Sequence, residues 1–153
     1  MFRFNLSLAP HAAIRGLHLR SIAGDIVRTV RCRNSIGSFD LVLAGGVFDY
    51  LNERHVVIIL RQIYYYLLRD GGRLYFSNMR RRNPYRLWMS YMADWNLIER
   101  NEDDIRRIAC TARIPVENLI VDTDPTTLSL LTVVTKRSIN DSFQRKDSNV
   151  QVP

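Results

Sequence analysis

The clearest pattern in the chain is one apolar helical face that lies between two short apolar stretches. The residues at helical spacing on that face are Val56, Ile59, Leu60, Ile63, Tyr64 and Leu67. Asn52 is the expected N-cap, and residues 70–72 (Asp-Gly-Gly) are expected to end the helix, because glycine accepts a left-handed C-cap conformation. Phe39–Ala44 and Arg73–Asn78 are predicted strands, so this segment is expected to form a right-handed βαβ unit. The first strand is a short apolar run closed by glycines, which predicts burial on both faces.

Weaker patterns continue the alternation of strands and helices on both sides of this unit. Upstream, Gly16–Ile22 alternates apolar and polar residues and predicts a strand, whereas Ile26–Ile36 is ambiguous, with a short helix as one option. Downstream, Asn101 is the expected cap of a second helix, and its apolar stripe consists of Ile105, Ile108, Ala109 and Ala112. Asn118–Thr123 and Leu128–Lys136 are predicted to pair as a hairpin.

These elements divide the 153 residues into three parts. Residues 1–16 are irregular, residues 17–137 form one α/β domain, and residues 138–153 are a polar tail predicted to be disordered. No uncharged apolar stretch reaches the length of a membrane span, about 20 residues, and no signal-peptide pattern is present. Cys32 and Cys110 match no metal-ligand spacing, so we expect two reduced thiols and a cytoplasmic protein.

The net charge of +7 favours an anionic partner such as a nucleic acid, a lipid surface or an acidic substrate. Several arginines fall on predicted helix faces, however, where a solvated role is more common. The three histidines form no cluster in the sequence, and we find no Ser-His-Asp or metal-ligand pattern. The net charge therefore favours an anionic partner but does not indicate which reaction, if any, the protein catalyses.

Three features in sequence order resemble the second half of class I S-adenosylmethionine-dependent methyltransferases. They are residues 39–42 (Phe-Asp-Leu-Val), residues 67–74 (Leu-Leu-Arg-Asp-Gly-Gly-Arg-Leu) and the C-terminal hairpin. Asp70 stands where the family commonly has proline. Residues 47–51 and 94–100 further resemble the fatty-acid carboxyl methyltransferases that make 3-hydroxypalmitate methyl ester. The resemblance implies a partial Rossmann-like sheet, mostly parallel with an antiparallel C-terminal hairpin. It also implies S-adenosylmethionine as donor and a small acid or lipid-like substrate.

The family's glycine-rich donor-binding turn has no counterpart here, because the sequence holds no GxGxG-like run. The resemblance therefore implies a truncated domain in which Phe39–Ala44 becomes an edge strand with exposed apolar side chains. We expect a marginal monomer that pairs its strands differently, self-associates or aggregates. A homo-oligomer or a partner chain would then complete the sheet.

The resemblance also implies positions for the methyl donor. Asp25 matches the acidic residue that accepts a hydrogen bond from the adenine amino group, although a Gly-Asp pair is also ordinary turn chemistry. Ala44, Gly45 and Gly46 end the strand at which small residues let a ligand approach the backbone, and a plain turn explains them equally well.

Candidate substrate contacts follow the same two strand ends. Asp49 is a candidate to orient a substrate hydroxyl or act as a base, and otherwise starts a helix; Tyr50 is a candidate aromatic wall. Arg80 is a candidate partner for a substrate carboxylate, together with Arg81, Arg82 and Arg86, although a solvated basic loop is more common. Trp95 belongs to an aromatic stretch with Trp88, Met89, Tyr91 and Met92 that forms either a cap over an acyl chain or, more often, core.

Three functions remain open at this point. The first is methyl transfer to a small-molecule or fatty-acid carboxyl group, which needs no strong base because the acceptor is already charged. The second is a catalytically inactive remnant that acts as a protein-interaction module. The third and least favoured is nucleic-acid binding through residues 80–82 and neighbouring aromatic rings.

Overall fold

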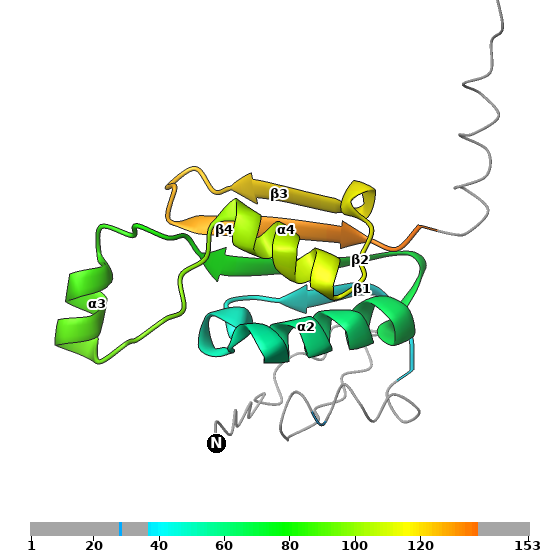
Figure 1. The fold of residues 1–153 in the computed structure, drawn as a ribbon, viewed down its shortest axis with the longest axis horizontal. Coiled ribbons are helices and arrows are strands. Elements are labelled where there is room, and N and C mark those ends of the chain that lie inside the picture. Colours follow the sequence, from blue (N-terminus) through cyan, green and yellow to red (C-terminus); the bar gives the residue numbers. More distant parts are fainter. Residues whose placement is uncertain (1–27, 29–36, 138–153) are drawn as a thin grey trace, which may run out of the picture.

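A four-stranded sheet organises the described part of the chain, which in this computed structural model is Arg28 and residues 37–137 (Figure 1). The predicted strand Gly16–Ile22, the predicted turn at Asp25 and the predicted tail at 138–153 lie outside these residues. The strands are β1 (Phe39–Ala44), β2 (Leu68–Met79), β3 (Leu119–Thr123) and β4 (Ser129–Thr135). Their order across the sheet is β1-β2-β4-β3.

The expectation of a mostly parallel sheet is wrong for the described strands. Only β1 and β2 pair in parallel, whereas β2 with β4 and β4 with β3 pair antiparallel. The predicted C-terminal hairpin is confirmed, and its second strand inserts between β2 and β3. The two central strands, β2 and β4, therefore pair with each other antiparallel, and the parallel pair is found only at the β1 edge of the sheet.

The predicted connection between the parallel strands is confirmed. Asn52 accepts a hydrogen bond from the backbone N–H of His55 and caps α2 (Glu53–Gln62), which continues as a π-helical turn over Ile63–Leu67. All six residues of the predicted apolar face are buried: Val56, Ile59, Leu60, Ile63, Tyr64 and Leu67. The helix therefore covers the sheet with the face that its periodicity indicates.

The two glycines after this helix do not form its C-cap, which corrects the prediction. The π-helical turn ends at Leu67, and β2 already begins at Leu68. Phe39 pairs with Leu68 and Leu41 with Arg73. The pairing therefore advances two residues along β1 but five residues along β2, which makes a bulge in β2. Gly71 takes a positive φ of 81° inside this bulge. Gly71 thus serves strand pairing, which here requires the same left-handed freedom as a helix end.

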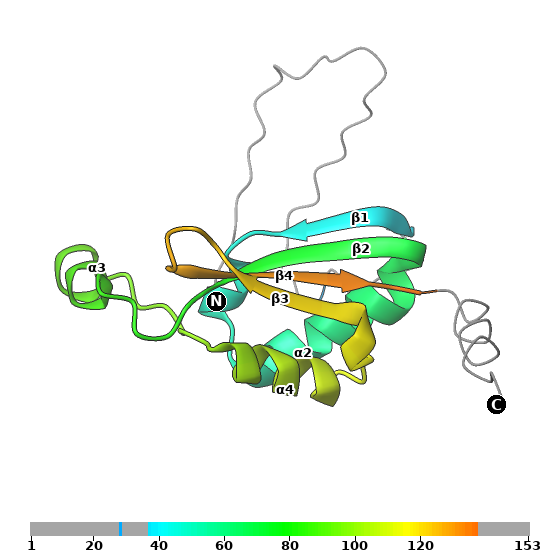
Figure 2. The same cartoon turned by 90° about the horizontal axis from the view of Figure 1, so that it is seen from above.

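The second helix packs beside the first on the same face of the sheet (Figure 2). Asn101 caps α4 (Glu102–Thr111) in a capping box with Asp104, which confirms the predicted cap. The predicted stripe is buried at all four positions: Ile105, Ile108, Ala109 and Ala112. With both helices on one face, the described residues place no helix on the other.

Strand β1 is not buried on both faces, contrary to the expectation from its apolar run. Phe39, Leu41 and Leu43 are 38%, 52% and 71% exposed. The strand instead lies at the edge of the described sheet, as the resemblance implied. Its pattern of apolar residues is that of an internal strand, but the described residues provide no neighbour on its free side.

The aromatic stretch after β2 does not join the core, so the preferred interpretation of it is wrong. Helix α3 (Arg86–Ala93) stands apart from the sheet on two connecting segments and has no buried residue (Figure 1). Trp88 is 66% exposed and Tyr91 is 91% exposed. The core is formed instead between the sheet and helices α2 and α4.

We expect Gly72→Ala to lower the free energy of unfolding, because it crowds the backbone where β1 and β2 pair. A Cβ at Gly72 would lie 2.8 Å from the carbonyl oxygen of Arg69 and 3.0 Å from that of Phe39, and both are backbone atoms. Overpacking of this kind costs about 1–3 kcal/mol of unfolding free energy, measurable by chemical denaturation. Gly45→Ala is the control, because no atom lies within 4 Å of its added Cβ. Equal effects of the two substitutions would contradict the proposed close approach of β1 and β2.

Candidate functional site

The candidate site lies where the two parallel strands end. Strand β1 leads through Gly45 and Gly46 into a 3₁₀ helix, Val47–Tyr50. Gly46 has a positive φ of 65°, and its N–H donates to the Ser77 hydroxyl of β2 at 3.0 Å. Parallel strands end at the same edge of a sheet, so the loops that follow β1 and β2 meet here.

A buried polar cluster joins these loops. Asp49, Asn78 and Arg100 are 6%, 1% and 4% exposed. Asp49 Oδ1 accepts hydrogen bonds from the Asn78 side-chain amide and, at 2.7 Å, from the Met79 backbone N–H. Asn78 Oδ1 in turn accepts from Arg100 Nη1 at 3.0 Å. The amide of Asn78 therefore bridges a carboxylate and a guanidinium, because it offers both a donor and an acceptor.

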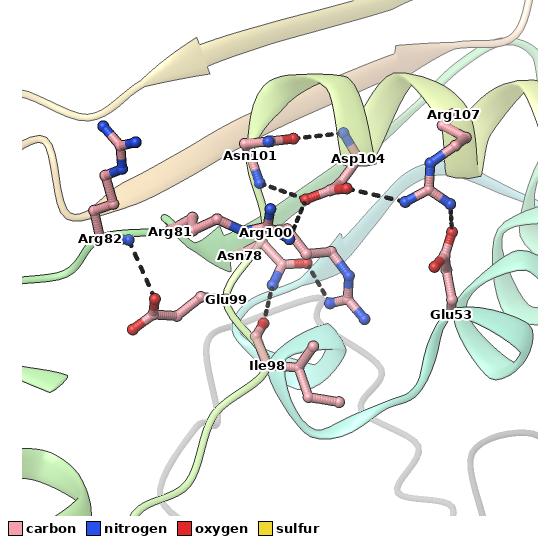
Figure 3. Close-up of polar contacts among 10 residues, drawn as sticks. All are labelled: Glu53, Asn78, Arg81, Arg82, Ile98, Glu99, Arg100, Asn101, Asp104 and Arg107. Atoms are coloured by element: carbon pink, nitrogen blue, oxygen red, sulfur yellow. Dashed lines mark hydrogen bonds and ion pairs between the residues drawn. The ribbon is translucent and has the colours of Figure 1, made fainter.

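Arg100 fixes the turn after β1 through its remaining donors. Its Nη1 donates to the Phe48 carbonyl at 2.7 Å, and its Nη2 donates to the Leu51 carbonyl at 2.6 Å. Figure 3 shows its guanidinium beneath Asn78, pointing toward the turn. One side chain thus satisfies one carbonyl within the 3₁₀ helix and one directly after it, and charge-assisted hydrogen bonds are the stronger kind.

Burial shifts the ionisation of both charged members of the cluster. Desolvation raises the pKa of Asp49 above its usual value, although the Met79 N–H, the charge of Arg100 and the Asn78 amide oppose the shift. Desolvation likewise lowers the pKa of Arg100, against the attraction of Asp49 and two further carboxylates. Each group therefore depends on its neighbours to remain charged.

The segment that returns from α3 is held by a second set of contacts (Figure 3). Arg81 pairs with Asp104 at 3.1 Å, and the Arg82 backbone N–H donates to Glu99 at 3.2 Å. The Ile98 N–H donates to the Asp49 carbonyl at 2.8 Å. The two connecting segments of α3 are thereby fixed to the rest of the fold close to the buried cluster.

Two residues predicted to contact substrate lie against each other. Trp95 Nε1 donates to the Tyr50 hydroxyl at 2.6 Å, across 45 positions of sequence. Trp95 also lines a pocket of about 140 Å³ between α3 and the segment after it. The remaining lining residues are Met79, Arg86, Met89, Ser90, Asn96, Leu97 and Glu99. The aromatic stretch is thus divided: Met89 and Trp95 line this pocket, and Trp88, Tyr91 and Met92 do not.

The other predicted site residues are distributed unevenly. Ala44, Gly45 and Gly46 lie together at the end of β1, and Asp49 is buried directly after them. Arg80 follows β2; its backbone N–H donates to the Leu128 carbonyl, and it forms an isolated bridge with Arg100. Asp25 lies outside the described residues. Among residues 37–137, no group of His, Cys, Asp and Glu side chains is arranged to hold a metal ion.

Sequence reasoning assigned no role to Asn78 or Arg100. Asn78 ends a predicted apolar strand, and a polar residue at an inward position of such a strand is the signal that was available. Arg100 gives no comparable signal, because its burial depends on the fold of residues 47–51. None of the helices in the described residues is long and apolar enough to cross a membrane.

Comparison with solved structures identifies the architecture. The structure is similar to an O-methyltransferase family protein from Burkholderia thailandensis, with a TM-score of 0.55 and 14% identity over 77% of this chain and 36% of that one. Human N-acetylserotonin methyltransferase, solved with S-adenosylmethionine, gives a TM-score of 0.55 and 14% identity over 75% of this chain and 33% of that one. The chain has a methyltransferase fold.

A third similar structure is the magnesium protoporphyrin IX methyltransferase of Synechocystis, solved with bound S-adenosylhomocysteine. Its TM-score is 0.50, with 13% identity over 76% of this chain and 50% of that one. The chain thus spans between a third and a half of the length of these three proteins. No protein-family model matches the sequence, and no curated protein matches it. The methyltransferase fold therefore rests on structure, and the fatty-acid subgroup stays a prediction.

Replacing Asp49 with Asn should change how stability depends on pH. Because burial raises the pKa of Asp49 in the folded state, its stabilising contribution is complete below the unfolded pKa and is lost as pH rises through the folded value. We expect Asp49→Asn to gain stability relative to the unsubstituted protein as pH rises above about 4. Denaturation across this pH range measures the difference, and the exposed Asp40→Asn controls for net charge. A loss of stability of Asp49→Asn relative to the unsubstituted protein as pH rises would contradict the buried, desolvated carboxylate.

Proposed function

We propose that this chain is a methyltransferase-type protein that takes its methyl group from S-adenosylmethionine and acts on a small or lipid-like carboxylic acid. The observation that supports this proposal most is the open backbone at the end of β1, in a chain with a methyltransferase fold. A side chain at Gly45 would meet no atom within 4 Å, so the backbone there is open to a ligand. The Tyr50–Trp95 pair and the pocket beside it provide a neighbouring place for the acceptor. A cytoplasmic location is part of the proposal.

The described residues fit only part of a binding site for this donor. Ala44, Gly45 and Gly46 suit close backbone contact, whereas the sequence contains no GxGxG-like run to hold the remainder. Asp25 is proposed to accept a hydrogen bond from the adenine amino group. When bound, S-adenosylmethionine supplies an electrophilic methyl group attached to a sulfonium.

Transfer to a carboxylate requires alignment more than proton transfer. A substrate carboxylate oxygen forms the new C–O bond while the methyl–sulfur bond breaks and its electron pair returns to sulfur, so no proton moves. The burial of Asp49 within a hydrogen-bonded cluster is compatible with this chemistry, because no base is needed. We propose Arg80 as the partner of the substrate carboxylate, with Tyr50 and Trp95 as the adjacent aromatic wall.

A second function is favoured by one observation, the position of β1 at the edge of the sheet formed by the described strands. An exposed apolar edge strand can pair with another chain, so an inactive protein-interaction module is the alternative. No observation of this kind favours nucleic-acid binding. Arg81 forms an ion pair with Asp104, and Arg86 Nε lies 4.0 Å from Glu99 Oε1, so both arginines already have carboxylate partners. Donor binding distinguishes the first two functions.

Titration calorimetry of the purified, folded chain with S-adenosylmethionine tests the proposal, and Gly45→Leu sharpens it. The leucine side chain would extend into the open space where the donor is proposed to lie, so we expect a loss of affinity of at least about tenfold, equivalent to about 1.4 kcal/mol. The unfolding free energy of Gly45→Leu should stay close to that of the unsubstituted chain.

Val116→Leu is the matched control, because Val116 is exposed on the 3₁₀ helix Val116–Asn118, away from the end of β1. It should bind the donor as the unsubstituted chain does. Absence of binding by a folded sample would reject donor binding by this chain and favour the interaction module.

A further inference from the structure

Helix α3 presents an apolar strip with nothing packed on it among the described residues. Leu87, Trp88, Tyr91 and Met92 are 80%, 66%, 91% and 69% exposed. Positions i, i+1, i+4 and i+5 of a helix share one side, so these four side chains form one continuous strip. Met89, by contrast, lines the pocket beside Trp95. The strip therefore belongs to the side of α3 that the candidate substrate pocket does not use.

The sheet presents a matching apolar surface on the face away from α2 and α4. Leu43 pairs with Tyr75, Tyr75 with Val133, and Val133 with Ile120, so one apolar row crosses all four strands. Leu43 is 71% exposed and Ile120 is 64% exposed. The neighbouring set of paired residues points to the opposite face. It runs from Leu74 through Val134 to Leu119, and all three residues are buried under the helices. One face of the sheet is thus covered, and the other, which we call the bare face, is apolar and carries no helix from residues 37–137.

The bare face has a shallow hollow, open to solvent, where β1 and β2 lie side by side. Leu41, Leu43 and Tyr75 supply the apolar part of this hollow, and Asp40, Gly71 and Arg73 complete it. A helix with its side chains is about 10–12 Å across, and neighbouring strands are about 4.8 Å apart. One helix therefore spans two to three strands, which suits a hollow above β1 and β2.

The α3 strip cannot reach this face of its own chain with its present attachments. In Figure 2, α3 lies beyond the end of the sheet and not over its bare face. The returning segment is tied to the Asp49 carbonyl through the Ile98 N–H, and the outgoing segment is tied to α4 through Arg81 and Asp104. These anchors hold the strip outward, where it can reach another molecule.

We propose that α3 of one copy of this chain packs its apolar strip on the bare sheet face of a second copy. Among the described residues, α3 has no partner for its strip and the sheet has no helix on this face, and helix-on-sheet packing is the ordinary way to bury both surfaces. Reciprocal exchange between two copies closes with twofold symmetry and buries each surface twice. The proposal is independent of whether the chain binds S-adenosylmethionine.

Sedimentation velocity of the full chain over a dilution series tests this pairing. We expect a dimer, and we expect Leu43→Glu and Tyr91→Glu each to raise its dissociation constant at least about tenfold, because each places a charge in an apolar contact. Val116→Glu is the matched control, because Val116 is 55% exposed and lies on neither surface. It should leave the dissociation constant unchanged. All three positions are exposed, so the unfolding free energy should change little in any variant.

A disulfide test fixes which surfaces touch. In a background with Cys32→Ser and Cys110→Ser, Leu43→Cys is mixed with Tyr91→Cys, and oxidation should link the two different variants faster than it links either variant to itself. A monomer at every concentration would overturn the proposal. So would a dimer that withstands Leu43→Glu or is equally disrupted by Val116→Glu. A monomer whose Leu43→Cys thiol resists modification would assign the bare face to residues 1–36 of the same chain.

Discussion

The structure depends on a buried charge that cannot be left without partners. Asp49 follows β1, Asn78 belongs to β2 and Arg100 precedes α4, and the three meet where they are almost fully removed from water. A buried carboxylate or guanidinium is strongly unfavourable alone, so each must keep its hydrogen-bond partners. That requirement joins the 3₁₀ helix after β1, the end of β2 and the segment before α4, which are distant in sequence.

The consequences of this cluster reach the candidate site and the proposed docking surface. Because Arg100 binds the carbonyls of Phe48 and Leu51, the turn after β1 has one conformation, and Tyr50 is placed to accept the Trp95 hydrogen bond. Because the segment before Arg100 is fixed beside Asp49, α3 is held away from the sheet. The same constraint therefore shapes the wall of the pocket and directs the exposed strip outward.

The sequence was sufficient wherever a local pattern determines the outcome. The buried faces of α2 and α4, and the caps at Asn52 and Asn101, follow from spacing and from short side chains that accept backbone hydrogen bonds. The positions of Gly45 and Gly46 at the end of a strand also follow from the sequence. Their proposed contact with a donor, like the roles of Tyr50, Arg80 and Trp95, stays a prediction.

Predictions failed where the outcome depends on which segments meet. The apolar run of β1 predicts burial, but its neighbours decide whether water reaches it, and Leu43 is exposed. The apolar strip of α3 was interpreted as core, although periodicity shows only that residues share a side. Gly71 and Gly72 carry a turn signal whose use in a strand bulge depends on the register with β1. The burial of Arg100 is likewise set by tertiary contacts that no local pattern encodes.

The most direct test of this account is a double-mutant cycle between Asp49 and Arg100, measured by chemical denaturation at pH 8. Arg100→Met should cost about 3–5 kcal/mol when Asp49 is present, because a buried carboxylate then loses its compensating positive charge. The same substitution in an Asp49→Asn background should cost less by about 1–3 kcal/mol, since no buried charge remains to be compensated. An equal cost in both backgrounds would show that the two side chains act independently and would contradict the cluster as the organising element of the site.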